Sequence, residues 1–247
     1  MTSLVALVTG GGGGIGSAIC RRLASDGLVV LVGYHSAEER AEQLAADLPG
    51  EGHRAVRVAV DDSAALAEAA ADVATTELRL DVLVNCAGMT RPVAHDDLDA
   101  LDDDLIDQIF ATNWRGPFAT IRAFRSLLQS SDAPVVVNIS SVAGITGQGS
   151  NVAYCASKAA LDSMTRSLGR ALAPKIRVMS VSPGWVMGEY ASRMPEEVIA
   201  VQRDATPLNR LATGDDVAAA VSAVVNDLPF TTGAIVSVDG GRPLGVA

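Results

Sequence analysis

The 247-residue sequence is poor in aromatic residues and cysteines, and it has no long apolar run. Only 4% of the residues are aromatic, so Val, Ala, Leu and Ile must build the core, which fits a parallel sheet buried on both faces. Cys20, Cys86 and Cys155 are far apart and odd in number, which argues against a disulfide framework and a metal site. The first residues, MTSLVALVTG, have no basic segment, and no run is long enough to span a membrane. We therefore expect a cytoplasmic protein with no membrane partner.

Basic residues are also in short supply. The 19 Lys and Arg residues against 29 Asp and Glu give a net charge of -10, which repels phosphate backbones and argues against a nucleic-acid partner. The densest acidic stretch, Asp96–Asp107, is interleaved with Leu98, Leu101 and Leu105. We interpret it as the start of an amphipathic helix with a solvated acidic face, rather than as an interaction tail.

Short apolar runs alternate with segments of helical periodicity along the chain. The runs that predict strands are Leu4–Val8, Leu28–Val32, Ala55–Val60, Val82–Val84, Val135–Ile139, Ile176–Val181 and Ile235–Val238. The segments that predict helices are Gly16–Ala24, Glu38–Leu48, Ala64–Thr75, Ile106–Leu128, Tyr154–Leu172 and Asp215–Val225. This alternation predicts an α/β fold, with about seven strands in one doubly wound, Rossmann-type parallel sheet and helices on both faces. No linker divides residues 1–247, so we expect one domain with its ligand site beyond the carboxyl ends of the strands.

A run of five glycines occupies most of TGGGGGIG, Thr9–Gly16. It directly follows the first predicted strand and opens into the first predicted helix, which is the place of a phosphate-binding loop rather than of an interdomain linker. Glycines allow positive φ angles and close approach of the backbone to a ligand. A Walker A loop is excluded because no Gly-Lys-Ser/Thr ends the run. The loop alone is weak evidence, so the other strand ends must decide.

Polar motifs follow the later strands. They are NCAG at 85–88, NISSVAG at 138–144, YCASK at 154–158 and SPG at 182–184. In this order and spacing, from TGGGGGIG to VDGG at 238–241, the sequence resembles the short-chain dehydrogenase/reductase family over essentially its whole length. Among its members, the sequence is most similar to the bacterial carrier-protein 3-oxoacyl reductases.

The resemblance implies hydride transfer between a nicotinamide cofactor and a ketone or secondary alcohol. It implies that Tyr154 exchanges a proton with the substrate oxygen and that Ser141, rather than the neighbouring Ser140, hydrogen-bonds that oxygen. Lys158 is expected to bind the nicotinamide ribose, and Asn113 to hold a water that connects Lys158 to solvent.

The residues themselves make the proton chemistry plausible. A tyrosine normally titrates near pH 10, so work near pH 7 requires a shift of about three pKa units. One neighbouring cation supplies about one to three units. Lys158 lies on the same helix face as Tyr154, and an oxidised nicotinamide ring would add a second positive charge. An isolated Tyr–Lys pair is more often a surface contact, and only the surrounding motifs favour the catalytic interpretation.

The resemblance also implies a set of cofactor contacts besides Tyr154 and Lys158. These are Gly10, Gly14, Ile15 and Gly16 at the pyrophosphate, Asp61 beside adenine, Asn85, Ala87 and Gly88 after the fourth strand, and Pro183, Gly184 and Val186 near the nicotinamide. Two positions depart from the family pattern: Cys86 replaces the commoner second asparagine, and Gly188 stands where many members have a threonine that holds the carboxamide.

The second predicted strand ends without the carboxylate that usually selects NAD. Tyr34, His35 and Ser36 can all donate hydrogen bonds there, which favours NADP(H) over NAD(H). Gly13 argues against this preference for NADP(H), because many NADP-preferring members have Arg or Lys at this position. An exposed loop histidine is an equally good interpretation of His35.

The substrate pocket is expected to include His95, Gln148, Trp185 and Met187. The mostly apolar character of the pocket suits a ketone with a hydrophobic or acyl portion. The resemblance implies a 3-oxoacyl-type ketone delivered by an acidic carrier protein, for which Arg122, Arg125 and Lys175 are the candidate contacts. The alternatives are an NAD-dependent secondary alcohol or diol dehydrogenase of a catabolic pathway, and a non-catalytic protein that senses the cofactor. Presence of Asn113 and the other three catalytic residues argues against the sensor. The family resemblance also implies a homotetramer.

Overall fold

The computed structural model describes residues 3–188, 191 and 194–244. Within these residues the chain forms one seven-stranded sheet in the order β3-β2-β1-β4-β5-β6-β7, and every neighbouring pair is parallel. The strands are β1 (Val5–Thr9), β2 (Val29–Tyr34), β3 (Arg54–Arg57), β4 (Val82–Asn85), β5 (Val135–Ile139), β6 (Arg177–Pro183) and β7 (Ile235–Val238). The order reverses at β1, so the crevice between β1 and β4 is where such a sheet binds its ligand.

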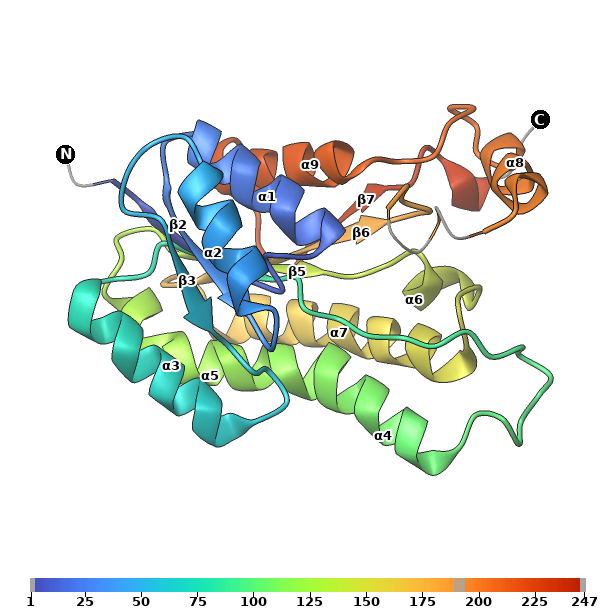
Figure 1. Ribbon diagram of the computed structural model, residues 1–247, viewed down its shortest axis with the longest axis horizontal. Helices are drawn as coiled ribbons and strands as arrows, with labels where there is room; N and C mark the ends of the chain where they lie inside the picture. Colours follow the sequence, from blue (N-terminus) through green and yellow to red (C-terminus); the bar gives the residue numbers. More distant parts are fainter. Residues whose placement is uncertain (1–2, 189–190, 192–193, 245–247) are drawn as a thin grey trace.

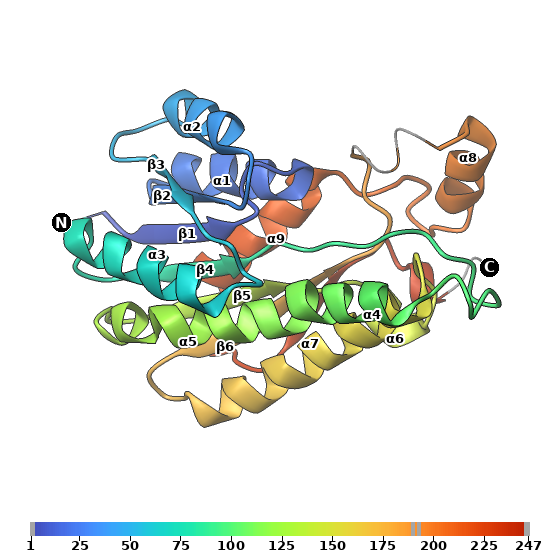
Figure 2. The same cartoon turned by 60° about the horizontal axis from the view of Figure 1, so that its bottom comes forward.

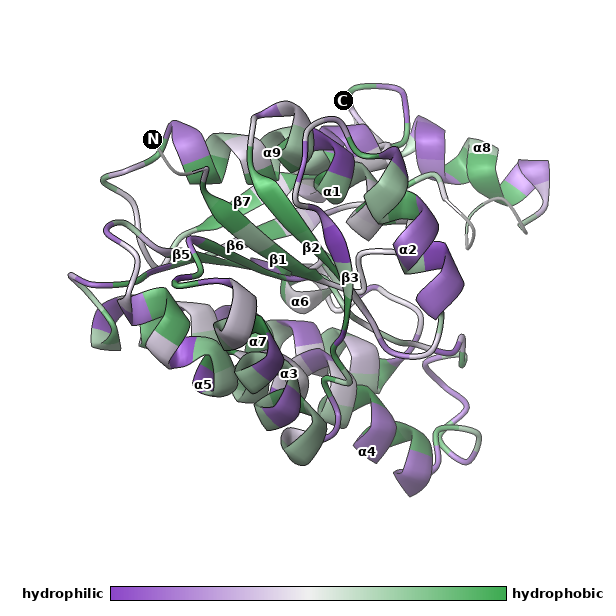
Figure 3. Cartoon of the chain, turned by 60° about the vertical axis from the view of Figure 1, so that its left-hand side comes forward, coloured by the Kyte–Doolittle hydropathy of each residue, from purple (hydrophilic) through white to green (hydrophobic). Residues whose placement is uncertain are grey.

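Helices cover both faces of the sheet, as predicted (Figure 1 and Figure 3). One face carries α1 (Gly14–Ser25), α2 (Glu38–Asp47) and α9 (Gly214–Asn226). The other carries α3 (Ser63–Thr76), α4 (Asp103–Phe110), α5 (Gly116–Gln129) and α7 (Val152–Ala171). Two short helices, α6 (Ala143–Thr146) and α8 (Glu196–Asp204), lie beyond one end of the sheet, as Figure 2 shows for α8.

The core consists of two apolar layers, one on each face of the sheet. Successive side chains of a strand point to opposite faces. Val8 of β1 accordingly packs with Ile19 of α1, whereas Leu7 packs with Phe124 of α5. Ala6, Leu7 and Val8 at the centre of β1 are all fully buried. Because side chains on both faces of a strand are buried in this way, the strands appear in the sequence as uninterrupted apolar runs.

The helix predicted at Ile106–Leu128 is interrupted. A π-helical segment, η1 (Ala111–Arg115), separates α4 from α5. Such π segments often occur at functional positions, and this one contains the fully buried Asn113. The apolar periodicity of the sequence continues through the interruption and gives no sign of it.

Two further expectations need correction. The acidic stretch starts its helix only at Asp103, because Asp102 caps it by accepting the N–H of Leu105 at 2.8 Å. The third strand ends at Arg57 rather than Val60. The short helices α6 and α8 were not expected. Among the described residues, no helix has the length and apolarity needed to cross a membrane.

Candidate active site

A cavity of about 1540 Å³ opens beyond the carboxyl ends of the strands. Pockets for one small ligand usually have 300–1,000 Å³, so this cavity has room for a dinucleotide and a substrate together. Most of the predicted site residues line it: Gly10, Gly14, Ile15, Gly16, His35, Asp61, Ala87, Gly88, Ser141, Gln148, Tyr154, Lys158, Pro183, Gly184, Trp185, Val186 and Met187. Tyr34, Ser36, Asn85, His95 and Asn113 do not line it.

The glycine run forms a tight loop against the segment that follows β4. Gly10 has a φ of +64°, and a Cβ there would lie 2.9 Å from the Cα of Ala87. A Cβ on Gly16 would lie 2.2 Å from the carbonyl oxygen of Gly10, so only glycine fits. Thr9 ties the two segments together, because its Oγ1 accepts the N–H groups of Cys86 and Ala87, each at 3.1 Å.

Gly14, by contrast, has open space where a Cβ would be, although it begins helix α1. The start of α1 therefore presents bare backbone N–H groups to the cavity, as a pyrophosphate requires. This cradle of glycines fits a dinucleotide cofactor.

Tyr154 and Lys158 lie on the first turns of α7. Asn151 caps this helix by accepting the N–H of Tyr154 at 2.7 Å. Because the two residues are four apart, Lys158 Nζ lies 5.8 Å from the centre of the Tyr154 ring. Nζ also donates to the carbonyl oxygen of Ile139 at 2.8 Å. Lys158 is buried, and this burial lowers the pKa of its ammonium to about 8.

Ser141 follows β5 and faces the same cavity. Its Oγ accepts the N–H of Ala143 at 3.2 Å, which leaves the hydroxyl proton able to reach a ligand. The loop lies directly on α7, because a Cβ on Gly144 would lie 2.8 Å from the backbone N of Ala159. The chain therefore sets Ser141 beside the helix that carries Tyr154 and Lys158.

Asn113 lies behind the cavity wall. Its Oδ1 accepts the N–H of Met89 and its Nδ2 donates to the carbonyl oxygen of Met89, both at 2.9 Å. Nδ2 also donates to Ser157 Oγ at 3.2 Å. Gly88 lies between Asn113 and Lys158: a Cβ there would be 3.4 Å from Asn113 Oδ1 and 3.9 Å from Lys158 Nζ. Asn113 thus joins the segment after β4 to helix α7.

Another predicted amide, Asn85, is also inside the protein rather than at the cavity. It is buried at the end of β4, and its Nδ2 donates to Asn138 Oδ1 at 2.8 Å. Its contribution is to join β4 to β5, so the expected direct contact with a cofactor is not supported by its position.

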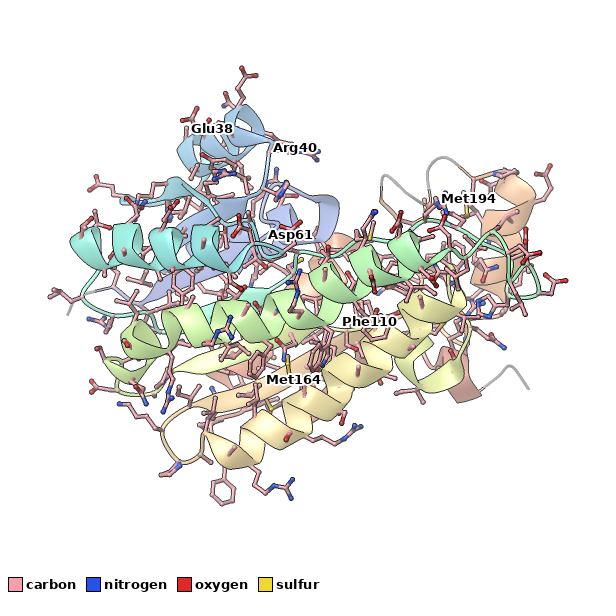
Figure 4. The ribbon with its side chains drawn as sticks, turned by 90° about the horizontal axis from the view of Figure 1, so that it is seen from below. Glu38, Arg40, Asp61, Phe110, Met164 and Met194 are labelled. Atoms are coloured by element: carbon pink, nitrogen blue, oxygen red, sulfur yellow. The ribbon has the colours of Figure 1, made fainter. Side chains whose placement is uncertain are left out.

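At the end of the cavity near β2 and β3, His35 Nε2 lies 3.5 Å from Asp61 Oδ1. Tyr34 turns away from this wall, because its hydroxyl donates to Glu38 Oε1 at 2.6 Å, a bond that raises the pKa of the tyrosine to about 12. Arg40 of α2 lies on the same side: its Cγ is 3.7 Å from where a Cβ of Gly12 would be. Figure 4 shows Arg40 and Asp61 on this side and Met194 beside α8 on the other.

At the other end, the segment after β6 supplies Trp185, Val186 and Met187. A short parallel bridge between Val186 and Ala212 holds this segment in place. His95 was expected in the substrate pocket but sits outside the lining, with Nε2 3.1 Å from the carbonyl oxygen of Gly149.

Sequence reasoning missed three lining residues at this end: Gln202 of α8, and Arg242 and Pro243 after β7. Arg242 could have been suspected, since it follows VDGG at a strand end, where ligand-binding residues gather. Gln202 had no such signal. One proposed carrier contact is also misplaced: Lys175 lies two residues before β6, at the opposite end of the strand, and donates to the carbonyl oxygen of Ser131 at 2.5 Å.

Comparison with known proteins agrees with this geometry. Residues 11–242 match the family described as Enoyl-(Acyl carrier protein) reductase. A proposed ketoacyl reductase of the granaticin polyketide synthase of Streptomyces violaceoruber is 37% identical, covering 97% of this chain and 96% of its own. The cis-4-hydroxycyclohexanecarboxylate dehydrogenase of Sinomonas cyclohexanicum is 35% identical, over 96% of this chain and 95% of its own.

The fold comparison leads to the same group. The crystal structure of a proposed short-chain dehydrogenase/reductase from Burkholderia xenovorans superposes with a TM-score of 0.91 at 31% identity, over 99% of this chain and 100% of its own. With this fold, this spacing of Tyr154 and Lys158 and these relatives, the chain is an oxidoreductase and belongs to the short-chain dehydrogenase/reductase family.

Proposed function

We propose that the protein reduces a 3-oxoacyl-type or similar ketone to the secondary alcohol with NADPH as the hydride donor. The main support is the distance of 5.8 Å between Lys158 Nζ and the centre of the Tyr154 ring. Both residues line the same cavity as the glycine loop, so a proton donor and a dinucleotide site lie together. The bound nicotinamide would supply the hydride to the substrate carbon. The chain itself has to hold the carbonyl and deliver a proton to its oxygen.

In this proposal Tyr154 donates its phenolic proton to the substrate oxygen, and Ser141 donates a hydrogen bond to the same atom. The ammonium of Lys158 stabilises the phenolate that remains. Burial lowers its pKa, although Cys86 and Asp162 act in the opposite direction. Among the described residues, its Nζ donates to the carbonyl oxygen of Ile139 and to no carboxylate, so its charge is available to a neighbouring anion. In our proposal, the hydrogen bonds of Asn113 to Met89 keep the segment after β4 in place. This segment lies between Asn113 and Lys158, so a chain of waters from Lys158 to solvent would run beside it.

The preference for NADP(H) over NAD(H) is also part of the proposal. Support comes from the end of β2, where the segment Tyr34–Ser36 itself has no carboxylate, from His35 in the cavity lining, and from Arg40 beside Gly12 of the glycine loop. Binding titrations with 2′,5′-ADP and 5′-AMP test this point apart from turnover. We expect 2′,5′-ADP to bind at least 10-fold more tightly, and equal affinities would contradict the preference.

The sequence relatives support two different classes of substrate. One relative is described as a ketoacyl reductase and the other as a dehydrogenase of a hydroxy carboxylate. The second fits the alternative function, an NAD-dependent dehydrogenase of a secondary alcohol or diol. If an acidic carrier protein delivers the substrate, Arg122 and Arg125 of α5 remain its candidate contacts. Pull-down with an acyl carrier protein by the wild type and an Arg122→Glu/Arg125→Glu variant tests that partner.

We further propose a homotetramer. Phe110, Trp114 and Phe118 form an apolar face with Met164 and Leu168 of α7, along a shallow second cavity, and Figure 4 shows Phe110 and Met164 next to each other there. Trp114 and Phe118 are more than a third exposed, which is unusual for large aromatic side chains unless a partner covers them. Light scattering of the wild type and of Phe118→Glu tests the assembly.

The central experiment is a screen of ketones and secondary alcohols with NADPH, NADH and their oxidised forms. The proposal expects reduction of short 3-oxoacyl thioesters with NADPH. Oxidation of alcohols or diols with NAD and no reduction of ketones would favour the alternative. Cofactor binding without turnover of any compound would favour a sensor.

A further inference from the structure

Arg242 is a cation in the wall of the cavity at the end away from Asp61. It lies four residues after the end of β7 and lines the cavity together with Gln202 and Pro243. Its guanidinium is held by one residue of helix α8: Nη1 donates to the backbone oxygen of Gln202 at 2.9 Å, and Nη2 donates to the side-chain oxygen of Gln202. Two contacts from two nitrogen atoms fix the plane of the guanidinium.

Neither these contacts nor any other among residues 3–188, 191 and 194–244 gives Arg242 a counter-ion. Both acceptors on Gln202 are neutral, and no carboxylate of the described residues lies within ion-pairing distance of Arg242. The guanidinium has five N–H donors, of which two are used. Partial burial without a counter-ion also lowers the pKa of this group.

The absence of a counter-ion is notable in a chain with a net charge of -10. A second arginine of this region, Arg203, is the next residue after Gln202 and pairs with Glu196 and Asp204. The described acidic residue that lines the cavity, Asp61, is at the opposite end, beside His35. Arg242 is therefore the charged side chain among the described lining residues at this end, and the apolar walls from Trp185 and Met187 strengthen its field.

We propose that Arg242 is a specificity-determining residue that binds a carboxylate of the substrate. This inference rests on the proposed function, since it concerns the ketone or alcohol on which the site would act, and it adds that this compound is an acid with its carboxylate remote from the reacting carbon. Arg is well suited to the task because its planar donors bind a carboxylate with two parallel hydrogen bonds. Gln202 is the positioning residue that presents those donors to the cavity.

The test compares keto acids with their uncharged esters. The probes are levulinate and 4-oxocyclohexanecarboxylate, each against its methyl ester, assayed with the wild type, Arg242→Gln and Arg203→Gln. We expect the wild type to prefer the acids in kcat/KM. Arg242→Gln should lower kcat/KM for the acids about 10- to 100-fold, mainly through KM, which is the range for a hydrogen bond to a charged group. The esters should change less than about 2-fold, which is the scatter of such comparisons.

Arg203→Gln is the matched control, because it removes the same charge at the residue next to Gln202, on α8 and outside the cavity lining. Its preference for acids should remain that of the wild type. Equal kcat/KM for acid and ester in the wild type, or equal losses for both in Arg242→Gln, would overturn the inference. So would weaker NADP+ binding by Arg242→Gln to the same degree, since the arginine would then serve the cofactor.

A binding measurement separates this inference from the proposed function. Calorimetry with the NADP+ complex compares cyclohexanecarboxylate with cyclohexanecarboxamide and requires no turnover. Tighter binding of the carboxylate that disappears in Arg242→Gln supports the inference even if no ketone is reduced. Reduction of the esters together with equal binding of the two ligands would leave the proposed function intact and overturn the carboxylate site alone.

Discussion

Lys158 Nζ lies 5.8 Å from the centre of the Tyr154 ring while it donates to the carbonyl oxygen of Ile139 at 2.8 Å. The lysine is thus held from one side by strand β5 and approaches the tyrosine from the other. We therefore expect a substitution of either side chain to affect turnover, each in a different way.

Replacing Tyr154 with Phe should remove turnover and retain cofactor binding. The substitution deletes only the hydroxyl, and the ring keeps its place above the first turn of α7. General acid–base catalysis contributes about 10²- to 10⁴-fold, so kcat should fall by at least that factor. Steady-state kinetics and an NADPH fluorescence titration measure the two quantities. Full residual activity would remove Tyr154 from the mechanism.

Replacing Lys158 with Met should raise the pH needed for alcohol oxidation, because the cation that favours the phenolate is lost. The pH profile of kcat/KM tests this, and an unmoved profile would count against the role.

The same variant should reveal the low pKa of Lys158 through stability. In the folded protein the pKa of Lys158 is about 8, below the usual 10.5. Below pH 8 the lysine is protonated in both the folded and the unfolded protein, and burial of its charge lowers the free energy of unfolding there. Between pH 8 and 10.5 the unfolded chain binds more protons, and the wild type should gain stability relative to Lys158→Met. Urea unfolding at pH 7.5 and 10 measures the difference; parallel changes in both proteins would contradict it.

Asn113→Ala should destabilise the protein by about 2–4 kcal/mol, because it leaves the buried N–H and carbonyl groups of Met89 without their partner. The loss should also lower kcat, since the segment after β4 borders Lys158. Urea denaturation and kinetics test both effects. Asn113→Asp, which keeps the acceptor for the Met89 N–H, should recover part of the stability.

Two glycines of the same loop should respond differently to alanine. Gly16→Ala puts a Cβ 2.2 Å from the carbonyl oxygen of Gly10 and should destabilise the loop and abolish cofactor binding. The new methyl group of Gly14→Ala would have no described residue beyond its own helix within 4 Å, so thermal stability should stay near wild type while NADP(H) affinity falls. Calorimetric binding and thermal unfolding distinguish the two. Equal unfolding temperatures for both variants would contradict the steric argument.

Gly188→Thr should tighten cofactor binding. A Cβ on Gly188 meets no atom of the described residues within 4 Å, so the larger side chain has room among them, and its hydroxyl would provide the carboxamide contact that the family resemblance implies. One hydrogen bond typically adds 0.5–1.5 kcal/mol, or about 2- to 12-fold in Kd. Gly188→Val, which is nearly the same size without a hydroxyl, is the control; the same gain in that variant would exclude the hydrogen bond.

The parts of the site that the sequence predicted are those set by local spacing. Tyr154 and Lys158 meet because they are one helical turn apart, and the glycine run becomes a loop because a strand and a helix adjoin it. The contact between Gln202 and Arg242 joins residues 40 positions apart, and no periodicity could indicate it. The π-helical segment at Asn113 and the turn of Tyr34 toward Glu38 depend on local competition between hydrogen bonds, which composition does not reveal.

The contact between Gly144 and α7 has a mechanical consequence. Because the backbone of the Ser141 loop lies directly against the backbone of Ala159, Ser141, Tyr154 and Lys158, the residues that we propose for the proton chemistry, share one support. The walls near Trp185, Gln202 and Arg242 come from other segments of the chain. A change of substrate could therefore be engineered on those walls without disturbing the apparatus that moves the proton.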